Sequence, residues 1–361
     1  RKLVDVYNVI AVLIALVGMF VLSYNPTGFS GVNIGDILTF ICAIMVAFHI
    51  VSASYFQKKY NFDPALFVLV NIVTSFVLSG LLFVFTESLP VVEIKFYWPI
   101  LFLGVFNTAL GFLVQSFALK ISLPTRVSLI VALESIFAAV SSYIILNEEM
   151  TSAIIFGGAL IILGVLINEI RNSKNFEELK YVHSKYLFVI QNSFTKNIPI
   201  FHINNTVGGV LHAIIQQCIK LSIEKIGSPP ARFVWLSLGS QARKEQLVLS
   251  DQDNLIVFEN VAADKHRDVK FYFVQLAKLV IANMENLGYK PCPNEHLASN
   301  IKWCKSLSDF TSIYTNCIKS PGENMSDFNG IFFDFEYIYG ETKIKDSLEI
   351  AIHQSLSNNT L

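Results

Sequence analysis

The sequence has 361 residues, 27 of them basic and 28 acidic, so its formal net charge is −1 at pH 7. This length suits two domains, and a net charge near zero gives no electrostatic argument for nucleic-acid binding. The charges are unevenly spread: residues 1–170 carry 7 basic and 9 acidic side chains, whereas residues 171–361 carry 20 and 19. The first part is therefore too apolar for an ordinary soluble domain, and the second has a globular composition.

Six apolar runs in the first part each approach the ~20 residues that a helix needs to cross a bilayer. They lie near residues 4–23, 35–56, 64–86, 97–119, 124–146 and 151–170. One such run also fits a buried helix of a soluble protein, but six in series predict an all-α integral membrane segment over residues 1–170. The chain begins at Arg1 without a cleavable signal peptide, and we treat it as a candidate fragment of a longer protein.

Basic residues gather at alternate ends of the six runs. One set of ends carries Arg1, Lys2, Lys58, Lys59, Lys120, Arg126, Arg171 and Lys174. The other set carries Lys95 together with Asp36, Glu93, Glu148 and Glu149. Cytoplasmic loops hold the excess of Lys and Arg, so we expect both ends of the chain in the cytoplasm and a multi-pass protein of a bacterial inner membrane.

A few polar residues interrupt the apolar runs, and they are candidates for a transport pathway. They are His49, Asn71, Asn107, Gln115 and Glu134. Ionisable groups inside a membrane are costly and commonly functional, but pairing within the protein explains His49 and Glu134 equally well. Gly157, Gly158 and Gly164 suit close helix packing in the last run.

Two stretches of the membrane segment resemble the EamA-type repeat of the drug/metabolite transporter superfamily. They are "GDILTFICAIMVAFHIVSASYFQKKY" from Gly35 and "LIVALESIFAAV" from Leu129. The chain has Glu134-Ser135 and Asn147-Glu148 where the pattern has Glu-Pro and Gly-Glu, and it keeps Gly-Gly at Gly157. The resemblance implies one five-helix repeat plus one helix, which is half of such a transporter. A solute site between repeats would then require a homodimer through this segment, or further helices.

The second part alternates predicted helices and strands, which indicates an α/β or α+β domain. Residues 171–200 form a polar helical connector, and the domain spans 201–361, where we expect its C-terminal helical part to be truncated. Strands are predicted at 232–238, 254–260 and 330–338, and helices near 203–226, 266–287 and 343–357.

The stretch "GSQARKEQLVLSDQDN", residues 239–254, links the first two strands and carries the candidate site. Gly239 lets the backbone approach a phosphate, and the Ser240 hydroxyl and local N–H groups can bind its oxygens. Arg243 and Lys244 can neutralise phosphate charge. The same residues also fit an ordinary Gly-Ser turn followed by a polar turn or cap.

Three aspartates complete the candidate site. Asp251 and Asp253 alternate at the start of the second strand, so their side chains share a face and can hold Mg²⁺ (or Mn²⁺). Asp334 lies in the third predicted strand among aromatic residues, where a carboxylate is costly unless it is paired or metal-bound. Three aspartates on adjacent strands predict a two-metal site for phosphoryl displacement.

The cysteines form no CxxC pair, and an odd number without metal-ligand spacing predicts free thiols in a reducing compartment. They are Cys42, Cys218, Cys292, Cys304 and Cys317. Cys292, His296 and Cys304 lie close in sequence, so a zinc site and a pair of core cysteines are both open, although the spacing matches no common zinc pattern.

Three blocks, in order, resemble the GlnD-like nucleotidyltransferases of the DNA polymerase beta superfamily, in the subfamily often attached to CBS domains. They are "GSQARKEQLVLSDQDN" from Gly239, "GYKPCPNEHLASNIKWCKSL" from Gly288 and "IFFDFEYIYG" from Ile331, and the match runs from about residue 178 to the end. Leu297 replaces the usual Met of the second block.

This resemblance implies metal-dependent transfer of a nucleoside monophosphate, as in protein uridylylation. Asp251, Asp253 and Asp334 would be catalytic and bind the metal, with Asp334 activating the acceptor. The triphosphate would lie on Gly239 and Ser240 with Arg243 balancing its charge. Asn254, Asn300 and Trp303 would shape the pocket, although Trp303 fits a core position equally well.

We therefore expect a membrane-anchored nucleotidyltransferase that uses a nucleoside triphosphate and Mg²⁺ on an unidentified acceptor. The alternative is a solute transporter whose second domain senses nucleotide.

Overall fold

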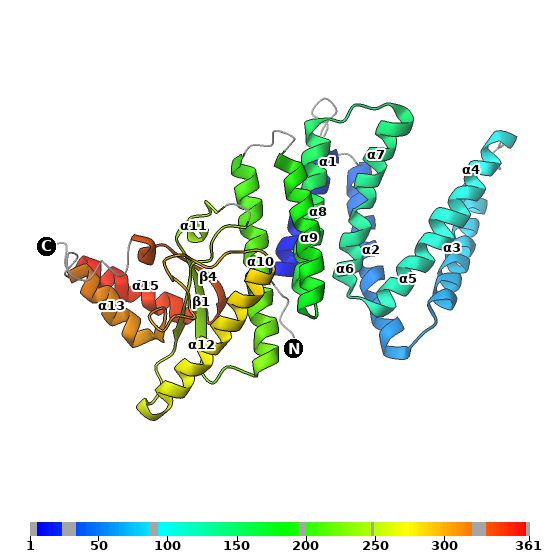
Figure 1. Ribbon diagram of the computed structural model, residues 1–361. Coiled ribbons are helices and arrows are strands. Elements are labelled where there is room, and N and C mark those ends of the chain that lie inside the picture. The colour runs from blue at the N-terminus through cyan, green and yellow to red at the C-terminus, as the bar shows by residue number, and fades with distance from the viewer. Residues whose placement is uncertain are drawn as a thin grey trace. The chain divides into compact units, whose positions relative to one another are not determined.

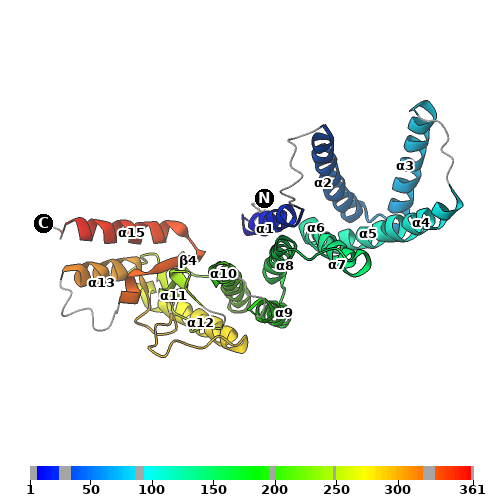
Figure 2. The same cartoon turned by 90° about the horizontal axis from the view of Figure 1, so that it is seen from above.

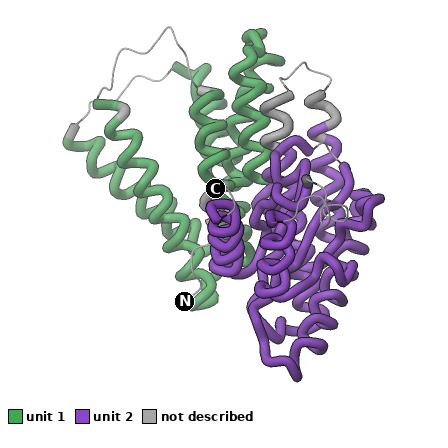
Figure 3. Tube along the Cα trace, turned by 90° about the vertical axis from the view of Figure 1, so that its left-hand side faces the viewer, with its two compact units in different colours: residues 1–165 green, residues 166–361 purple. Residues whose placement is uncertain are grey.

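The computed structural model describes residues 6–23, 34–86, 93–194, 200–246, 249–319 and 330–358. The chain divides into two compact units, residues 1–165 and 166–361, which are coloured separately in Figure 3. The described part of the first unit is helical, and the second unit contains a small mixed sheet with helices (Figure 1). The predicted fold class, a helical membrane segment followed by an α+β domain, is confirmed.

Helices make up the membrane segment. They are α1 (Val6–Ser23), α2 (Ile34–Tyr60), α3 (Pro64–Thr86), α4 (Tyr97–Phe102), α5 (Gly111–Ile121), α6 (Pro124–Ala132), α7 (Glu134–Leu146) and α8 (Ser152–Asn172). The 3-10 turn η1 (Ile94–Phe96) precedes α4, and the π-helical segment η2 (Leu103–Leu110) joins α4 to α5.

Five stretches of the described residues are long and apolar enough to cross a membrane. They are Ile37–Tyr60, Pro64–Phe85, Ile94–Ile121, Pro124–Leu146 and Ser152–Asn172, which match the last five predicted spans. The first predicted span, residues 4–23, corresponds to α1. Its described apolar stretch, Ala11–Leu22, is shorter than a span, so the prediction of six spans holds for five.

The backbones of α1 and α8 approach one another within the first unit. A Cβ atom placed on Gly157 would lie 2.6 Å from the Gly18 carbonyl oxygen, and one on Gly164 would lie 2.6 Å from the Ala11 carbonyl oxygen. Small residues permit this approach between membrane helices, where van der Waals packing is a main source of association. The predicted packing role of Gly157 and Gly164 is confirmed.

Buried polar side chains join α2 to α5. The Gln57 amide donates to Ser116 Oγ at 2.9 Å, and Ser54 Oγ donates to the Leu119 carbonyl at 3.2 Å. Such bonds supply specific attachment between helices in an apolar environment.

Two lysines cap neighbouring helix ends. Lys58 donates to the Ser122 carbonyl at 2.5 Å, and Lys120 donates to the Phe62 carbonyl at 3.2 Å. The short connections at residues 61–63 and 122–123 therefore lie at the same end of these helices.

The second unit begins within α8 and continues through a four-stranded sheet. Its helices are α9 (Phe176–Phe194), α10 (Ile200–Ile226), α11 (Gly239–Ala242), α12 (Ala263–Asn286), α13 (Leu307–Lys319) and α15 (Thr342–Ser357). Its strands are β1 (Phe233–Leu238), β2 (Asn254–Phe258), β3 (Cys304–Ser306) and β4 (Phe335–Gly340), and the 3-10 turn η3 (Gly330–Phe333) precedes β4. The strand order is β3-β2-β1-β4, with β1 antiparallel to both neighbours and β3 parallel to β2.

Helices cover both faces of this sheet. On one face α13 and α15 lie side by side (Figure 2), and Phe310 and Leu348 pack against Leu236 and Val257 in one buried cluster. On the other face α12 packs through Phe273, whose ring lies 5.5 Å from that of Phe258, and α10 contacts both α12 and β4. Alternation of side chains along β1 and β2 thus supplies apolar groups to two layers.

The third predicted strand, residues 330–338, is corrected by the structure. Residues 330–333 form η3, the strand covers 335–340, and Asp334 lies between them rather than within a strand. Phe332 is fully buried and stacks on Tyr314 at a centroid distance of 3.8 Å, which fixes the turn before β4. The short parallel strand β3 was not predicted, because three residues carry too little periodic pattern.

Adjacent glycines on α8 provide a matched test of the α1–α8 packing. The Gly157→Ala substitution should destabilise the protein by about 1–3 kcal/mol relative to Gly158→Ala, because overpacking forces the backbones apart. A Cβ at Gly158 meets Ile136 at an ordinary 3.7 Å. Thermal unfolding of both full-length variants in detergent micelles measures the difference, and equal melting temperatures would contradict the packing.

Candidate active site

The end of β1 turns sharply at Gly239. This residue has φ +59°, and a Cβ there would lie 2.6 Å from the Ile331 side chain and 3.8 Å from Asp253 Oδ2. A left-handed conformation with so little space favours glycine. Ser240 follows in the short helix α11, so the predicted phosphate-binding pair occupies the strand-to-helix turn.

Backbone hydrogen bonds place an aspartate on each side of this turn. The Leu238 N–H donates to the Asp253 carbonyl at 3.0 Å, and the Gly239 N–H donates to the Asp334 carbonyl at 3.0 Å. Asp253 precedes β2 and Asp334 precedes β4, the two strands that flank β1. The sheet therefore brings to the two sides of one turn the backbones of two aspartates that are 81 positions apart in the sequence.

Asp251 and Asp253 differ in exposure although they alternate along the chain. Asp251 is exposed, the Asp253 side chain is 14% exposed, and Gln252 and Asn254 between and after them are buried. That the two carboxylates share a face stays a prediction.

Arg243 is held by acidic side chains in this structure. It donates to Asp334 Oδ2 at 2.6 Å and to Glu245 Oε2 at 2.9 Å. The guanidinium group predicted to contact a triphosphate therefore neutralises the third aspartate. Lys244, the other predicted phosphate contact, has φ +59°. It lies near Glu336, whose pKa is raised by burial, and the positive charge of Lys244 partly offsets this increase.

A segment that the sequence did not mark as part of the sheet completes the site. Residues 290–306 follow the edge of β2: the Gln252, Asn254 and Ile256 N–H groups donate to the carbonyls of Lys290, His296 and Trp303. The loop between these contact points carries Cys292 and His296. Asn254 holds the loop further, because its Oδ1 accepts from the Ala298 N–H at 2.8 Å.

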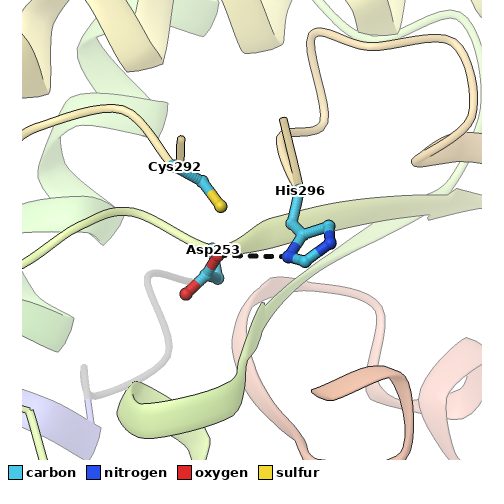
Figure 4. Close-up of side chains that lie close together, drawn as sticks. All are labelled: Asp253, Cys292 and His296. Atoms are coloured by element: carbon cyan, nitrogen blue, oxygen red, sulfur yellow. Dashed lines mark ion pairs between the residues drawn. The ribbon is translucent and has the colours of Figure 1, made fainter. Parts of the chain in front are cut away.

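Asp253, Cys292 and His296 form a cluster in which one ligand atom from each lies within 4.8 Å of the others (Figure 4). His296 Nδ1 lies 3.7 Å from Asp253 Oδ1, which exceeds a hydrogen-bond distance. Both atoms are buried, and neither has a hydrogen-bond partner among the described residues. Of the three residues considered for zinc in the sequence, Cys304 lies in β3 and is not part of this cluster.

Burial raises the pKa of the carboxyl and thiol groups of this cluster. It is the largest cause that raises the pKa of Asp253, an effect that Asp251 strengthens and that Cys292 and His296 oppose. Burial and the neighbouring Asp253 raise the pKa of the Cys292 thiol to about 11. A cation would favour the charged forms of both groups.

The carboxylates suit a hard divalent cation. Mg²⁺ prefers a few carboxylate oxygens together with substrate phosphates. Asp253 Oδ2 points to the Gly239 turn, and Oδ1 is buried without a hydrogen bond. The described residues include no group in which carboxylate oxygens of Asp251, Asp253 and Asp334 all lie within 4.8 Å of one another, so the metal site of three aspartates stays a prediction.

The three predicted pocket residues have different positions. Asn254 is buried and holds the loop, and Asn300 accepts from the Lys302 N–H at 3.0 Å in a turn at the loop's end. Trp303 is a core residue and is 2% exposed. The centroid of its ring lies 5.0 Å from that of the His296 ring and 5.7 Å from that of the Phe332 ring, and both pairs are edge-to-face.

The membrane unit contains a cavity of about 760 Å³. Its polar lining residues are His49, Gln57, Asn71, Ser75, Ser79, Thr108, Gln115 and Ser116. His49, Asn71 and Gln115 of the predicted pathway are thus brought together, whereas Asn107 and Glu134 are exposed and do not line the cavity. Thr108 belongs to the π-helical segment η2, a local irregularity that is frequent at functional sites.

Comparisons with known proteins agree with this division. Residues 33–169 match the model of the "EamA-like transporter family", and residues 187–324 match that of the family described as "Putative nucleotidyltransferase DUF294". The chain is also 30% identical over 171 residues to a protein named "Uncharacterized transporter" from Archaeoglobus fulgidus. The aligned region covers 47% of this chain and 54% of that relative, so the chain spans about half its length.

The loop attachment gives a testable expectation. Asn254→Ala leaves the buried Ala298 N–H without its acceptor, which costs about 1–3 kcal/mol and should loosen residues 291–300. Hydrogen exchange on the full chain in detergent should show faster exchange in this loop than in wild type. Exposed Asn294→Ala is the control, and unchanged exchange in Asn254→Ala would show that the bond does not hold the loop.

Proposed function

We propose that this chain, which joins an EamA-like membrane segment to a DUF294 nucleotidyltransferase domain, transfers a nucleoside monophosphate from a nucleoside triphosphate to an acceptor hydroxyl on a protein. The observation that supports the proposal is the Gly239 turn, because backbone hydrogen bonds place Asp253 on one side of it and Asp334 on the other.

In the proposed reaction the acceptor oxygen forms a bond to the α-phosphorus. The bond from this phosphorus to the oxygen that bridges it to the β-phosphorus breaks, and pyrophosphate leaves. Asp334 takes the acceptor proton, while the hydroxyl and the backbone N–H of Ser240 bind phosphate oxygens. Bound Mg²⁺ would neutralise charge on the phosphate oxygens.

Arg243 links nucleotide binding to acceptor activation in this proposal. Its guanidinium group binds Asp334 in the structure, and a triphosphate offers a stronger bidentate partner. Transfer of Arg243 to the phosphates would free Asp334 to accept a proton. The pair would thus keep the base neutralised until a nucleotide binds.

The membrane segment is proposed to hold this domain in an inner membrane with residues 61–63, residues 122–123 and the second unit on the cytoplasmic side, where nucleotide and Mg²⁺ are present. Support comes from the shared end of residues 61–63 and 122–123, which carries Lys58 and Lys120.

The transferase is tested with full-length protein in detergent micelles, Mg²⁺ and each α-labelled nucleoside triphosphate, with and without cell extract. We expect label on a protein and pyrophosphate release in wild type, and a loss of about 100-fold or more in Asp253→Asn and Asp334→Asn. Asp346→Asn on α15 is the matched control, because its carboxylate is exposed away from the turn. Equal rates in all four proteins, or no transfer from any nucleotide, would refute the proposal.

A second candidate function rests on the membrane cavity. We infer that it is a solute site of the EamA-like segment, lined by apolar side chains together with neutral amides, hydroxyls and His49, and therefore suited to an uncharged solute with apolar and polar parts. The aligned region covers 54% of the transporter relative. The inferred solute site therefore includes a second copy of this segment, or further helices.

Water in the cavity is testable by thiol labelling. In a Cys42→Ser background, Ser75→Cys should react at least about 10-fold faster with a membrane-impermeant thiol reagent than Val77→Cys, because lipid disfavours the thiolate that reacts. Ser75 lines the cavity, whereas Val77 is exposed on the same helix outside it, and the other four cysteines are buried. Equal rates would contradict a water-filled site.

A further inference from the structure

We propose that Asp253, Cys292 and His296 bind a divalent cation of the zinc class, at a site that differs in ligand type from the carboxylate set at the Gly239 turn. The inference goes beyond the proposed transfer reaction, and occupancy of the site can be measured without any activity.

The spacing of the ligand atoms is close to that of a metal site. Ligands at 2.0–2.3 Å from a tetrahedral ion are about 3.3–3.8 Å apart. Asp253 Oδ1 and His296 Nδ1 are 3.7 Å apart, and the Cys292 sulfur lies within 4.8 Å of a carboxylate oxygen of Asp253 and of a ring nitrogen of His296. Figure 4 shows the three side chains directed toward a common point, so a small movement of Cys292 would complete the site.

Unpaired buried atoms supply an independent argument. The His296 side chain is 8% exposed, and its Nδ1 is buried without a hydrogen-bond partner among the described residues; the same holds for Asp253 Oδ1. Buried polar atoms are nearly always paired, and each unpaired one destabilises the fold. A direct Asp–His hydrogen bond is too long at 3.7 Å, whereas one bound cation would satisfy both atoms.

The loop that carries two of the ligands is held in place by backbone contacts. The Glu295 N–H donates to the Cys292 carbonyl at 3.1 Å, and Glu295 has φ +58°, which is uncommon for a residue with a side chain. The His296 carbonyl accepts from the Asn254 N–H at 2.9 Å, and Trp303 supports the His296 ring. Preorganised ligands of this kind favour metal binding.

The ligand set selects the cation. One thiolate, one imidazole and one carboxylate suit Zn²⁺, whereas Mg²⁺ prefers oxygen ligands alone. Three protein ligands leave a fourth position open. Asp253 uses Oδ1 here while its Oδ2 faces Gly239, so this carboxylate can bridge the zinc-class ion and an ion at the turn.

The test uses Co²⁺ and Zn²⁺ as probes on full-length protein in detergent, after treatment with EDTA. We expect Co²⁺ to give a near-ultraviolet thiolate-to-metal absorption band, which equimolar Zn²⁺ removes, and Zn²⁺ to raise the melting temperature. Cys292→Ala and His296→Ala should weaken cation binding by at least about 10-fold. Cys304→Ala, another buried cysteine of this unit, should leave it unchanged.

Asp251→Asn separates this inference from the proposed function, because it should abolish nucleotidyl transfer and keep the Co²⁺ band. No band in wild type, or a full-strength band in Cys292→Ala, would overturn the inference whatever the transfer assay gives. X-ray absorption of the zinc-loaded wild type keeps the test valid if a variant unfolds: a sulfur ligand supports the site, and nitrogen and oxygen ligands alone refute it.

Discussion

The backbone turn at Gly239 is the constraint on which the rest of the second unit's site depends. β1 lies between two antiparallel neighbours, so its last N–H groups pair with the residues that precede both neighbouring strands. Those residues are Asp253 and Asp334, and the absence of a side chain at position 239 leaves room next to the Asp253 carboxylate. A single left-handed residue thus lies between the backbones of the two aspartates, at the turn that we propose binds phosphate.

The loop of residues 291–300 next to this turn is held by contacts with β2 and with the core. Asn254 attaches the loop of residues 291–300 to β2, and Trp303 packs beneath His296. The same loop gives Asp253 a second set of neighbours, with a sulfur and a nitrogen on the side opposite the turn. Asp253 therefore connects the two proposed cation sites, one with oxygen ligands and one with mixed ligands.

The membrane unit is organised by different interactions, because apolar burial does not distinguish helix from lipid. Close backbone contact at Gly157 and Gly164 joins α1 to α8, and buried amide and hydroxyl groups join α2 to α5. Gln57 and Ser116 of the α2–α5 contact also line the cavity, together with His49, Asn71, Gln115 and Thr108 of the π-helical segment.

The sequence by itself determined the apolar spans, the main helices and strands of the second unit and the residue types at the Gly239 turn, because periodic hydrophobicity and short glycine and aspartate motifs are local signals. It misplaced the strand at 330–338, where burial of Phe332 in a turn overrides the strand-like composition. Closeness in sequence groups Cys292 and His296 with Cys304. The parallel pairing of residues 290–306 with β2 brings Cys292 and His296 to Asp253 instead. Only the tertiary structure decided that Cys292 and His296 lie next to Asp253. It also decided that Arg243 pairs with Asp334 and that His49, Asn71 and Gln115 of the predicted pathway line one cavity. Strand pairing and helix packing join positions far apart in the chain, and no local pattern encodes which distant side chain they bring near.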